Sequence, residues 1–219
     1  MGYFITFEGV EGCGKTTQIR LLGECLESLG YSVVLTREPG GCSIADKIRA
    51  ILLDADNSEM CSLTELFLYA AARAQHISEV ILPALKTGSI VLCDRFTDAT
   101  IAYQSAGRGL DRSTVDTLNL LACQSLHPDL TILIDCDPVI GLGRAHSRIE
   151  SLSGPREERF ELETLEFHQR VRTGYLTLAR QEPHRFITVD AGGSIDDVSA
   201  RIAENVLQNR LRNNSYALL

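Results

Sequence analysis

The chain has 219 residues, of which 44% are hydrophobic and 23% charged, and its formal net charge at pH 7 is −8. These proportions are typical of a single folded domain and argue against long disordered segments. The negative charge argues against a duplex nucleic acid partner, which requires a basic face, but a small anionic ligand needs only a few arginines in one cleft.

Nothing in the chain indicates a secreted, disulfide-bonded or membrane protein. No apolar run approaches the roughly 18 residues that span a bilayer, and no basic segment precedes an apolar one at the N-terminus. The seven cysteines are odd in number and never form a C-x-x-C pair, so we interpret them as reduced thiols. We therefore expect a cytoplasmic protein without a membrane partner.

Short apolar runs alternate with helical patterns along the chain. In chain order, we expect a strand at 3–8, a helix at 15–29, a strand at 32–37, helices at 43–53 and 63–86, a strand at 89–94, a helix at 113–125, a strand at 130–135, a helix at 158–180 and a strand at 185–190. Nearly continuous apolar runs are typical of parallel strands covered on both faces. The order predicts an α/β fold with three α/β/α layers around a five-stranded parallel sheet.

No repeat or interdomain linker interrupts this pattern, and we expect one domain over residues 1–212. The stretch from Ser147 to Glu158 is rich in glycine, serine and charge, which favours a lid at about 144–159. The apolar pattern ends after Gln208, so we expect residues 213–219 to be a disordered tail.

The predicted strands end in acidic residues at four of five positions. These residues are Glu8, Asp94, Asp135 and Asp190. In open parallel sheets, ligands bind beyond the carboxyl ends of the strands. We therefore expect the chemistry at this edge, although capping of the following helices is the alternative role.

The strongest motif follows the first predicted strand and precedes the first helix. It matches G-x-x-x-x-G-K-[ST] over Gly9, Val10, Glu11, Gly12, Cys13, Gly14, Lys15, Thr16 and Thr17. Such a P-loop directs backbone N–H groups and a helix N-terminus at phosphates, which predicts the P-loop NTPase fold and ATP binding. We expect Lys15 to contact the β- and γ-phosphates, and Thr16, with Asp94, to ligate Mg²⁺.

Arginines beyond this loop indicate a second phosphate group. Arg37 ends the second predicted strand, Arg49 lies in the following helix, and Arg95 follows Asp94. Bidentate guanidinium groups at one sheet edge match phosphate oxygens. No N-K-x-D segment for reading guanine is present, which disfavours a switch GTPase and favours a kinase.

An ordered set of motifs resembles the thymidylate kinase family over nearly the whole chain. Besides residues 9–17, these motifs are Arg37-Glu38-Pro39-Gly40-Gly41, Asp94-Arg95-Phe96, Ala102-Tyr103-Gln104, Gly107-Arg108-Gly109, Arg159-Phe160-Glu161 and residues 170–176. The resemblance implies transfer of a phosphoryl group from ATP, with Mg²⁺, to dTMP, giving dTDP for dTTP biosynthesis. It also implies a homodimer.

The resemblance assigns substrate roles by position. It implies that Arg95 and Arg49 hold the acceptor monophosphate and that Pro39 packs beside its sugar. Glu11, inside the P-loop, faces the acceptor sugar and the transferring phosphate. The implied catalytic groups here are Lys15, Arg95 and Glu11.

The same resemblance implies a pocket for the base and the deoxyribose. Tyr69 stacks on thymine, Arg73 bonds a base carbonyl, and Thr100 reads the base edge. Tyr103, followed by Gln104, lies where a 2′-hydroxyl would protrude. Core packing is the alternative role for both tyrosines, and a charge on the helix surface is the alternative for Arg73.

The chain resembles the bacterial type, which places its catalytic arginine in the lid, because Gly12 and Cys13 stand where eukaryotic relatives have an arginine. Arg148 is our first choice for this role and Arg144 the second. Arg156 and Arg159 are further candidates, with solvated ion pairing as their alternative.

Three positions depart from the family pattern: Ala72 in place of aspartate, Ala99 in place of serine and Cys42 in place of threonine. They leave a kinase for another pyrimidine monophosphate open as an alternative. A partner-gated ATP-binding module is a second alternative, because the P-loop by itself indicates only a bound nucleoside triphosphate.

Overall fold

A computed structural model describes residues 2–150 and 159–215 of the chain. Its centre is a parallel sheet with the strand order β2-β3-β1-β4-β5. The strands are β1 (Tyr3–Glu8), β2 (Val33–Arg37), β3 (Ile90–Asp94), β4 (Leu130–Asp135) and β5 (Phe186–Asp190). The predicted five-stranded parallel sheet is confirmed, and three of its strands begin one residue later than expected.

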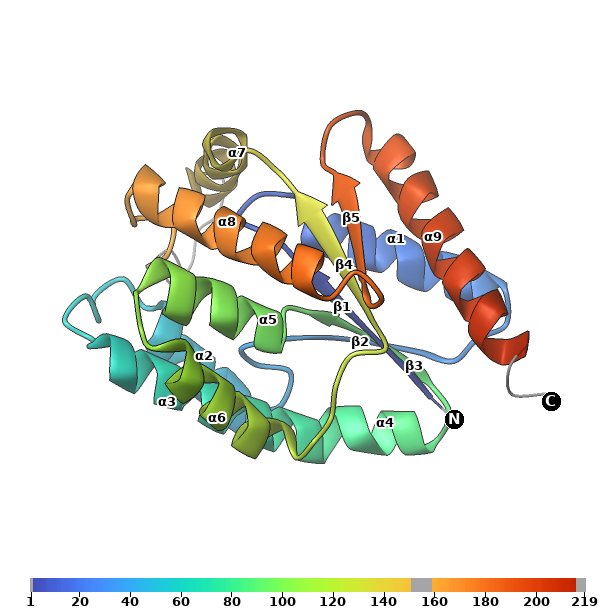
Figure 1. The fold of residues 1–219 in the computed structure, drawn as a ribbon, viewed down its shortest axis with the longest axis horizontal. Coiled ribbons are helices and arrows are strands. Elements are labelled where there is room, and N and C mark those ends of the chain that lie inside the picture. The colour runs from blue at the N-terminus through green and yellow to red at the C-terminus, as the bar shows by residue number, and fades with distance from the viewer. Residues whose placement is uncertain (1, 151–158, 216–219) are drawn as a thin grey trace.

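Helices cover both faces of the sheet (Figure 1). On one face α1 (Lys15–Ser28) lies beside α9 (Ile195–Ser215). The crossovers between the other strands contain α2 (Ser43–Leu53), α3 (Ser62–His76), α4 (Leu82–Lys86), α5 (Thr97–Thr100), α6 (Arg112–Cys123), α7 (Pro138–Glu150) and α8 (Leu165–Gln181). Three layers result, as the element order predicts.

Two π-helical segments interrupt the regular helices. The first, η1 (Ile77–Ile81), joins α3 to α4, so the predicted helix at 63–86 is one continuous run with a widened turn. The second, η2 (Ile101–Gly107), continues α5 and packs along α8. Such segments frequently lie at functional sites, and η2 carries Tyr103 and Gln104.

The predicted boundaries near the C-terminus differ most from the structure. The helix expected at 158–180 begins only at Leu165, because the Thr164 side chain accepts a hydrogen bond from the Phe167 N–H and caps the helix there. Residues 159–162 form turns instead. At the C-terminus, α9 continues through residues 213–215 of the predicted tail, and residues 216–219 lie outside the described part.

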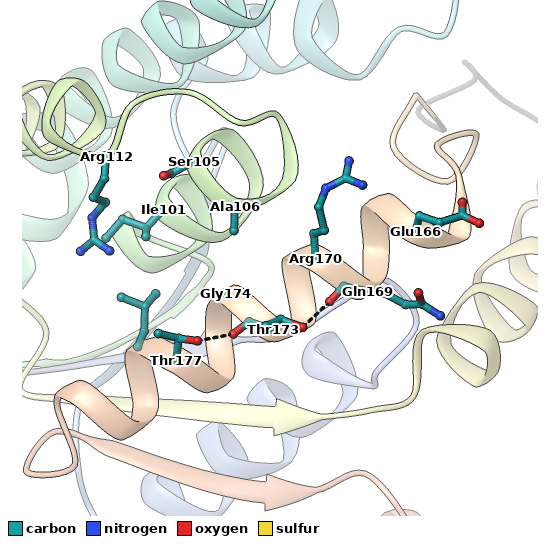
Figure 2. A pocket seen from close by; sticks show the side chains of 11 residues that line it. Ile101, Ser105, Ala106, Arg112, Glu166, Gln169, Arg170, Thr173, Gly174 and Thr177 are labelled. Atoms are coloured by element: carbon teal, nitrogen blue, oxygen red, sulfur yellow. Dashed lines mark hydrogen bonds between the residues drawn. The ribbon is translucent and has the colours of Figure 1, made fainter.

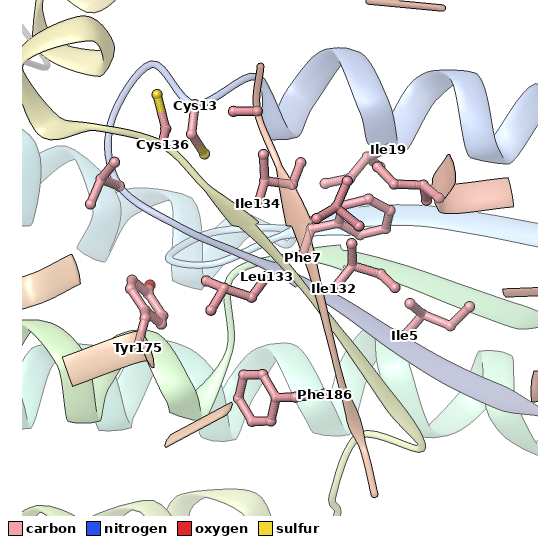
Figure 3. Close-up of a cluster of buried hydrophobic side chains, with 14 of the residues drawn as sticks. Ile5, Phe7, Cys13, Ile19, Ile132, Leu133, Ile134, Cys136, Tyr175 and Phe186 are labelled. Carbon is pink, nitrogen blue, oxygen red and sulfur yellow. The ribbon is translucent and has the colours of Figure 1, made fainter. Parts of the chain in front are cut away.

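The main core packs against the central strands β1 and β4. Figure 3 shows Ile5 and Phe7 of β1 beside Ile132 and Ile134 of β4. On the opposite face of β1, Phe4 meets Phe96 edge to face, with ring centroids 5.0 Å apart. Alternate residues of β1 thus enter different clusters, which explains why its sequence is apolar without a break.

The carboxyl ends of the strands meet at one edge of the sheet. Phe7 of β1 is paired in register with Asp94 of β3, and Arg37 of β2 is paired with the same aspartate. The motif at residues 9–17 therefore follows the central strand, at the point where the strand order reverses. Among the described residues, none of the helices is long and apolar enough to cross a membrane.

Candidate active site

The P-loop closes around the ammonium group of Lys15. Lys15 Nζ donates to the backbone oxygens of Gly9 at 3.1 Å and Val10 at 2.9 Å. Gly14 precedes α1 with a φ of 99°, a left-handed conformation that favours glycine. No side chain caps the N-terminus of α1, so its N–H groups remain directed toward an anion.

A hydroxyl and a carboxylate meet at the mouth of the loop. Thr16 Oγ1 donates to Asp94 Oδ2 at 3.2 Å, and the other carboxylate oxygen, Oδ1, is buried without a hydrogen-bond partner. Both residues therefore offer oxygen ligands of the kind that Mg²⁺ prefers. The orphaned oxygen of Asp94 fits a cation held in this place.

Glu11 connects the P-loop to the acceptor side of the site. Its Oε1 accepts hydrogen bonds from Arg95 Nη2 at 3.0 Å and from the Tyr103 hydroxyl at 2.6 Å. Burial by itself raises the pKa of this carboxyl, but the charges and hydrogen bonds of Arg95, His168 and Lys15 outweigh burial and lower the pKa from 4.5 to about 2. Glu11 is therefore an anion at neutral pH.

Arg95 is held from several sides. Its backbone φ is 69°, a left-handed conformation that residues other than glycine rarely adopt. Nη1 donates to the Tyr175 hydroxyl at 3.2 Å, and the guanidinium lies 4.7 Å from the centre of the Tyr103 ring. Five N–H donors leave this group able to bind further oxygens. The structure thus brings Arg95, Tyr103 and Glu11 together, as the sequence predicts.

A second carboxyl group, that of Glu8, is buried near Arg95, and its pKa is shifted in the opposite direction to that of Glu11. It accepts from the Phe96 N–H at 2.8 Å and from the Tyr175 hydroxyl at 2.8 Å. Burial, reinforced by the nearby Asp98, raises its pKa from 4.5 to about 8. The sequence marks Glu8 only as an acidic strand end, and its role as a partner of Tyr175 is visible only in the structure.

Arg49 and Pro39 lie together on the side of β2. Arg49 Nη1 donates to the Pro39 carbonyl oxygen at 3.0 Å, and the Glu38–Pro39 peptide bond is cis. Arg37 is more exposed and lies 3.6 Å from Asp46 on α2. Arg49 is thus adjacent to the proline that we predict beside the acceptor sugar.

Arg73 is buried rather than on the helix surface. Its Nε donates to Glu38 Oε2 at 2.7 Å, and Nη1 donates to Asn119 Oδ1 at 2.8 Å. Nη2 donates to the Phe96 carbonyl oxygen at 3.0 Å and to Thr100 Oγ1 at 2.9 Å. The structure thereby joins two residues predicted to read the base, and the alternative role of Arg73 as a surface charge is wrong.

Aromatic rings line the space between Tyr69 and Tyr103. Phe160 packs edge to face against Tyr103 at 5.5 Å and lies tilted against Tyr69 at 6.4 Å. Gln104 Nε2 is turned toward Glu65, to which it donates at 2.9 Å. In the sequence, Phe160 is identifiable only as part of a motif. Its contacts with both tyrosines are visible only in the structure.

The four candidate lid arginines have different surroundings. Arg144 is exposed on α7, and Arg148 lies on the same helix with its side chain outside the described part. Arg156 falls outside the described residues. Arg159 is 7% exposed, pairs with Glu65 at 2.7 Å and donates to the Leu52 carbonyl oxygen. The alternative role of Arg159 in a solvated ion pair is wrong, because its ion pair with Glu65 is buried.

A separate open groove runs between η2 and α8 (Figure 2). It contains none of the predicted site residues, and its walls are formed by Ile101, Ser105, Ala106, Arg112, Glu166, Gln169, Arg170, Thr173, Gly174, Thr177 and Leu178. The opposite face of α8 buries His168 and Tyr175, which contact Glu11 and Glu8. The site therefore lies on the P-loop side of α8.

Comparisons with known proteins agree with this geometry. A sequence model of the family described as thymidylate kinase matches residues 7–202. The chain is 72% identical over 219 residues to the thymidylate kinase of Pelobacter propionicus, covering 100% of both chains. It is 62% identical over 204 residues to that of Trichlorobacter lovleyi, covering 93% of this chain and 96% of the relative. The crystal structure of thymidylate kinase from Ehrlichia chaffeensis superposes with a TM-score of 0.76 at 36% identity, covering 94% of this chain and 98% of that one. The chain belongs to the thymidylate kinase family.

Proposed function

We propose that this protein is an ATP:dTMP phosphotransferase, which converts dTMP to dTDP for dTTP biosynthesis. The observation that carries the proposal is the contact between Glu11 of the P-loop and Arg95, at 3.0 Å. This contact joins a triphosphate-binding loop to an arginine at the end of the neighbouring strand. Two phosphate groups bound by these elements would meet, as transfer between two nucleotides requires.

The reaction is an in-line transfer of the γ-phosphoryl group to a 5′-phosphate oxygen of dTMP. That oxygen is already ionised near neutral pH, so the site needs no strong general base. Lys15 binds the donor phosphates, while Arg95 and Arg49 hold the acceptor phosphate. Positioning and neutralisation of charge carry most of the rate enhancement.

Thr16 and Asp94 are the residues that would hold Mg²⁺ together with the nucleotide phosphates. The cation supplies neutralisation of the negative charge that develops on the phosphate oxygens. The hydroxyl and the orphaned carboxylate oxygen described above support this assignment.

The acceptor base fits the surroundings of Arg73. The hydrogen bonds that Arg73 donates use the one N–H of Nε, one N–H of Nη1 and both N–H groups of Nη2. The second N–H of Nη1 is therefore left for a base carbonyl. Thr100 presents its hydroxyl to the same base edge, and Tyr69 provides the stacking surface. Tyr103 and Gln104 border the sugar, where Tyr103, held by Glu11, disfavours a 2′-hydroxyl.

A coupled ADP-release assay with dTMP, dUMP, dCMP, UMP and GMP tests which nucleotide is the acceptor. We expect dTMP to be preferred, with dUMP a weaker substrate, because one methyl group in an apolar pocket gives only about 1–3 kcal/mol of discrimination. A preference for a ribonucleotide or for dCMP would indicate a kinase for another monophosphate. No turnover dependent on any acceptor would indicate a partner-gated ATP-binding module.

We assign the catalytic arginine of the transferring phosphoryl group to α7, with Arg148 first and Arg144 second, in a lid at 144–159. An arginine in this role contributes about 10³-fold or more to the rate. Arg148→Ala should therefore lower kcat for dTMP, whereas Arg95→Ala should raise KM for dTMP. An unchanged kcat in Arg148→Ala, with a lowered kcat in Arg144→Ala, would exchange the two assignments.

We further propose a cytoplasmic homodimer of one-domain subunits, each folded over residues 1–212. Helices α2, α3 and α6 are neighbours (Figure 1). All three expose large apolar side chains. These side chains are Ile44, Ile51, Leu63, Phe67, Leu120 and Leu121. We call them the apolar face, and a second copy of the chain would cover it.

A further inference from the structure

The hydroxyl group of Tyr175 lies between the guanidinium of Arg95 and the carboxyl group of Glu8. Arg95 Nη1 donates to the Tyr175 oxygen at 3.2 Å, and the same oxygen lies 2.8 Å from Glu8 Oε2. A guanidinium has N–H donors and no acceptor, so the Tyr175 oxygen accepts from Arg95 whether Glu8 is protonated or ionised. The contact with Arg95 therefore requires no assignment of a proton to Glu8.

The P-loop provides a second acceptor for the same guanidinium. Arg95 Nη2 donates to Glu11 Oε1 at 3.0 Å, so the two terminal nitrogens are bound from two different elements, the P-loop and α8. The guanidinium also lies over the Tyr103 ring, 4.7 Å from its centre. Two hydrogen bonds at separate nitrogens fix the plane of the group, whereas one alone would leave it free to turn. Binding of a phosphate by two parallel N–H groups requires that plane to be fixed.

Tyr175 is itself held in place. Its side chain is 1% exposed and belongs to the main core (Figure 3), and its ring meets that of Tyr103 edge to face at 6.2 Å. The other oxygen of its partner Glu8, Oε1, accepts from the Phe96 N–H at 2.8 Å. Because Phe96 follows Arg95 in the chain, these contacts form a closed loop from the backbone beside Arg95 to its guanidinium. The position of the Tyr175 oxygen is thus set by the core and by that backbone.

Tyr175 belongs to the motif at residues 170–176, to which the proposed function gives no role. The two tyrosines of the proposed acceptor pocket have other tasks, because Tyr103 donates its hydroxyl to Glu11 at 2.6 Å and Tyr69 offers a stacking surface. At 1% exposure, Tyr175 presents almost no surface to a bound nucleotide. An effect of Tyr175 on the acceptor therefore passes through Arg95.

We infer that Tyr175 is a positioning residue, whose hydroxyl oxygen fixes the plane of the Arg95 guanidinium for the acceptor phosphate. Helix α8 thereby takes part in recognition of the acceptor without touching it. Removal of the hydroxyl would leave an N–H of Arg95 unsatisfied and would leave Glu11 to orient the guanidinium. The inference rests on the proposed function, because it takes Arg95 as the group that holds the phosphate of dTMP.

Titration calorimetry of the whole protein with dTMP and with thymidine tests this role. Tyr175→Phe removes the hydroxyl and keeps the ring that contacts Tyr103. Thymidine has the base and sugar of dTMP but no phosphate, so its affinity does not depend on a phosphate held by Arg95. We expect Tyr175→Phe to raise the Kd for dTMP about tenfold and the Kd for thymidine by less than about twofold. Thr177→Val removes a hydroxyl from the exposed side of the same helix and, as the matched control, should change neither Kd.

A double-mutant cycle tests whether Tyr175 acts through Arg95. In an Arg95→Ala background, Tyr175→Phe should change the Kd for dTMP by less than about twofold, because the group that Tyr175 positions is gone. A loss of about tenfold in that background would show that Tyr175 acts by another route and would overturn the inference.

The binding of thymidine separates positioning from a general loss of packing. Equal losses of affinity for dTMP and thymidine in Tyr175→Phe would overturn the inference, as would an unchanged Kd for dTMP. Both of these results leave the proposed function intact. A wild-type protein that does not bind dTMP would refute the proposed function and the inference with it.

Discussion

Glu8 and Glu11 are three positions apart and meet opposite environments. Glu11, in the P-loop, faces cationic groups that lower its pKa to about 2. Glu8, at the end of β1, faces Asp98 across a buried region, and its pKa is about 8. Burial raises the pKa of both carboxyls, so the sign of the net shift is decided by the charges beside each one.

Glu11→Gln should lose a stabilising contribution that depends on pH. The folded pKa of Glu11, about 2, is below the ordinary 4.5, so its charge stabilises the fold above pH 4.5, and this contribution is lost as the pH falls toward 2. At pH 7 the contribution is on the order of 3 kcal/mol. Urea denaturation of wild type and Glu11→Gln from pH 7 to pH 3 measures it. The gap in stability between the two proteins should narrow below pH 4.5, and a gap that stays constant from pH 7 to pH 3 would contradict the lowered pKa.

Glu8→Gln should show the opposite dependence on pH. The folded pKa of Glu8 is about 8, above the ordinary 4.5, so the stability present below pH 4.5 is lost as the pH rises through 8. Relative to Glu8→Gln, the wild type should lose about 1.4 kcal/mol per pH unit within this window. The measurement is urea denaturation from pH 5 to pH 8.5. A constant difference over this range would contradict the raised pKa.

At the scale of elements, α7 packs closely on the P-loop. A Cβ atom built on Gly141 would lie 2.3 Å from the Glu11 carbonyl oxygen, and one on Gly12 would lie 1.9 Å from the Gly141 oxygen. Glycine at both positions thus lets the helix that follows β4 approach the loop that follows β1. The helix carrying the two candidate catalytic arginines is positioned through this contact.

Gly141→Ala should separate α7 from the P-loop. The added methyl group meets backbone rather than a flexible side chain, so we expect a loss of about 1–3 kcal/mol of stability and a several-fold higher KM for ATP. Gly143→Ala, on the same helix, is the matched control, because no atom lies within 4 Å of its Cβ. Equal behaviour of the two variants in thermal unfolding and ATP kinetics would count against the contact.

At the scale of the whole molecule, the proposed homodimer depends on the apolar face on α2, α3 and α6. Its members include Phe67 at 51% and Leu121 at 69% exposure. Phe67→Glu and Leu121→Glu would each place charge in an apolar contact, and such charges are costly when buried. We expect light scattering after size-exclusion chromatography to show a dimeric wild type and monomeric variants at micromolar concentration.

The control for the dimer is Leu29→Lys. Leu29 is 54% exposed beyond the end of α1, away from the apolar face. This variant should remain dimeric. A wild-type protein that elutes as a monomer would refute the homodimer, and dimers in both glutamate variants would place the interface on another surface.

The sequence by itself determined the sheet and the P-loop. Continuous apolar runs and the spacing of Gly9, Gly14 and Lys15 are local patterns, whose physical causes act within a few residues. The five parallel strands follow these patterns to within one residue. Arg95 and Glu11 also come together, because each follows a strand that ends at the same edge of the sheet, and Tyr103 joins them from η2.

Only the tertiary structure decided which partner each buried polar group meets. Arg159 pairs with Glu65 in the interior, and His168 reaches Glu11, although no local pattern connects these residues. The start of α8 likewise depends on a single cap at Thr164. Charge and hydrogen bonding are decided by groups brought together from distant segments, so they follow from the packing of the whole chain rather than from the sequence around each residue.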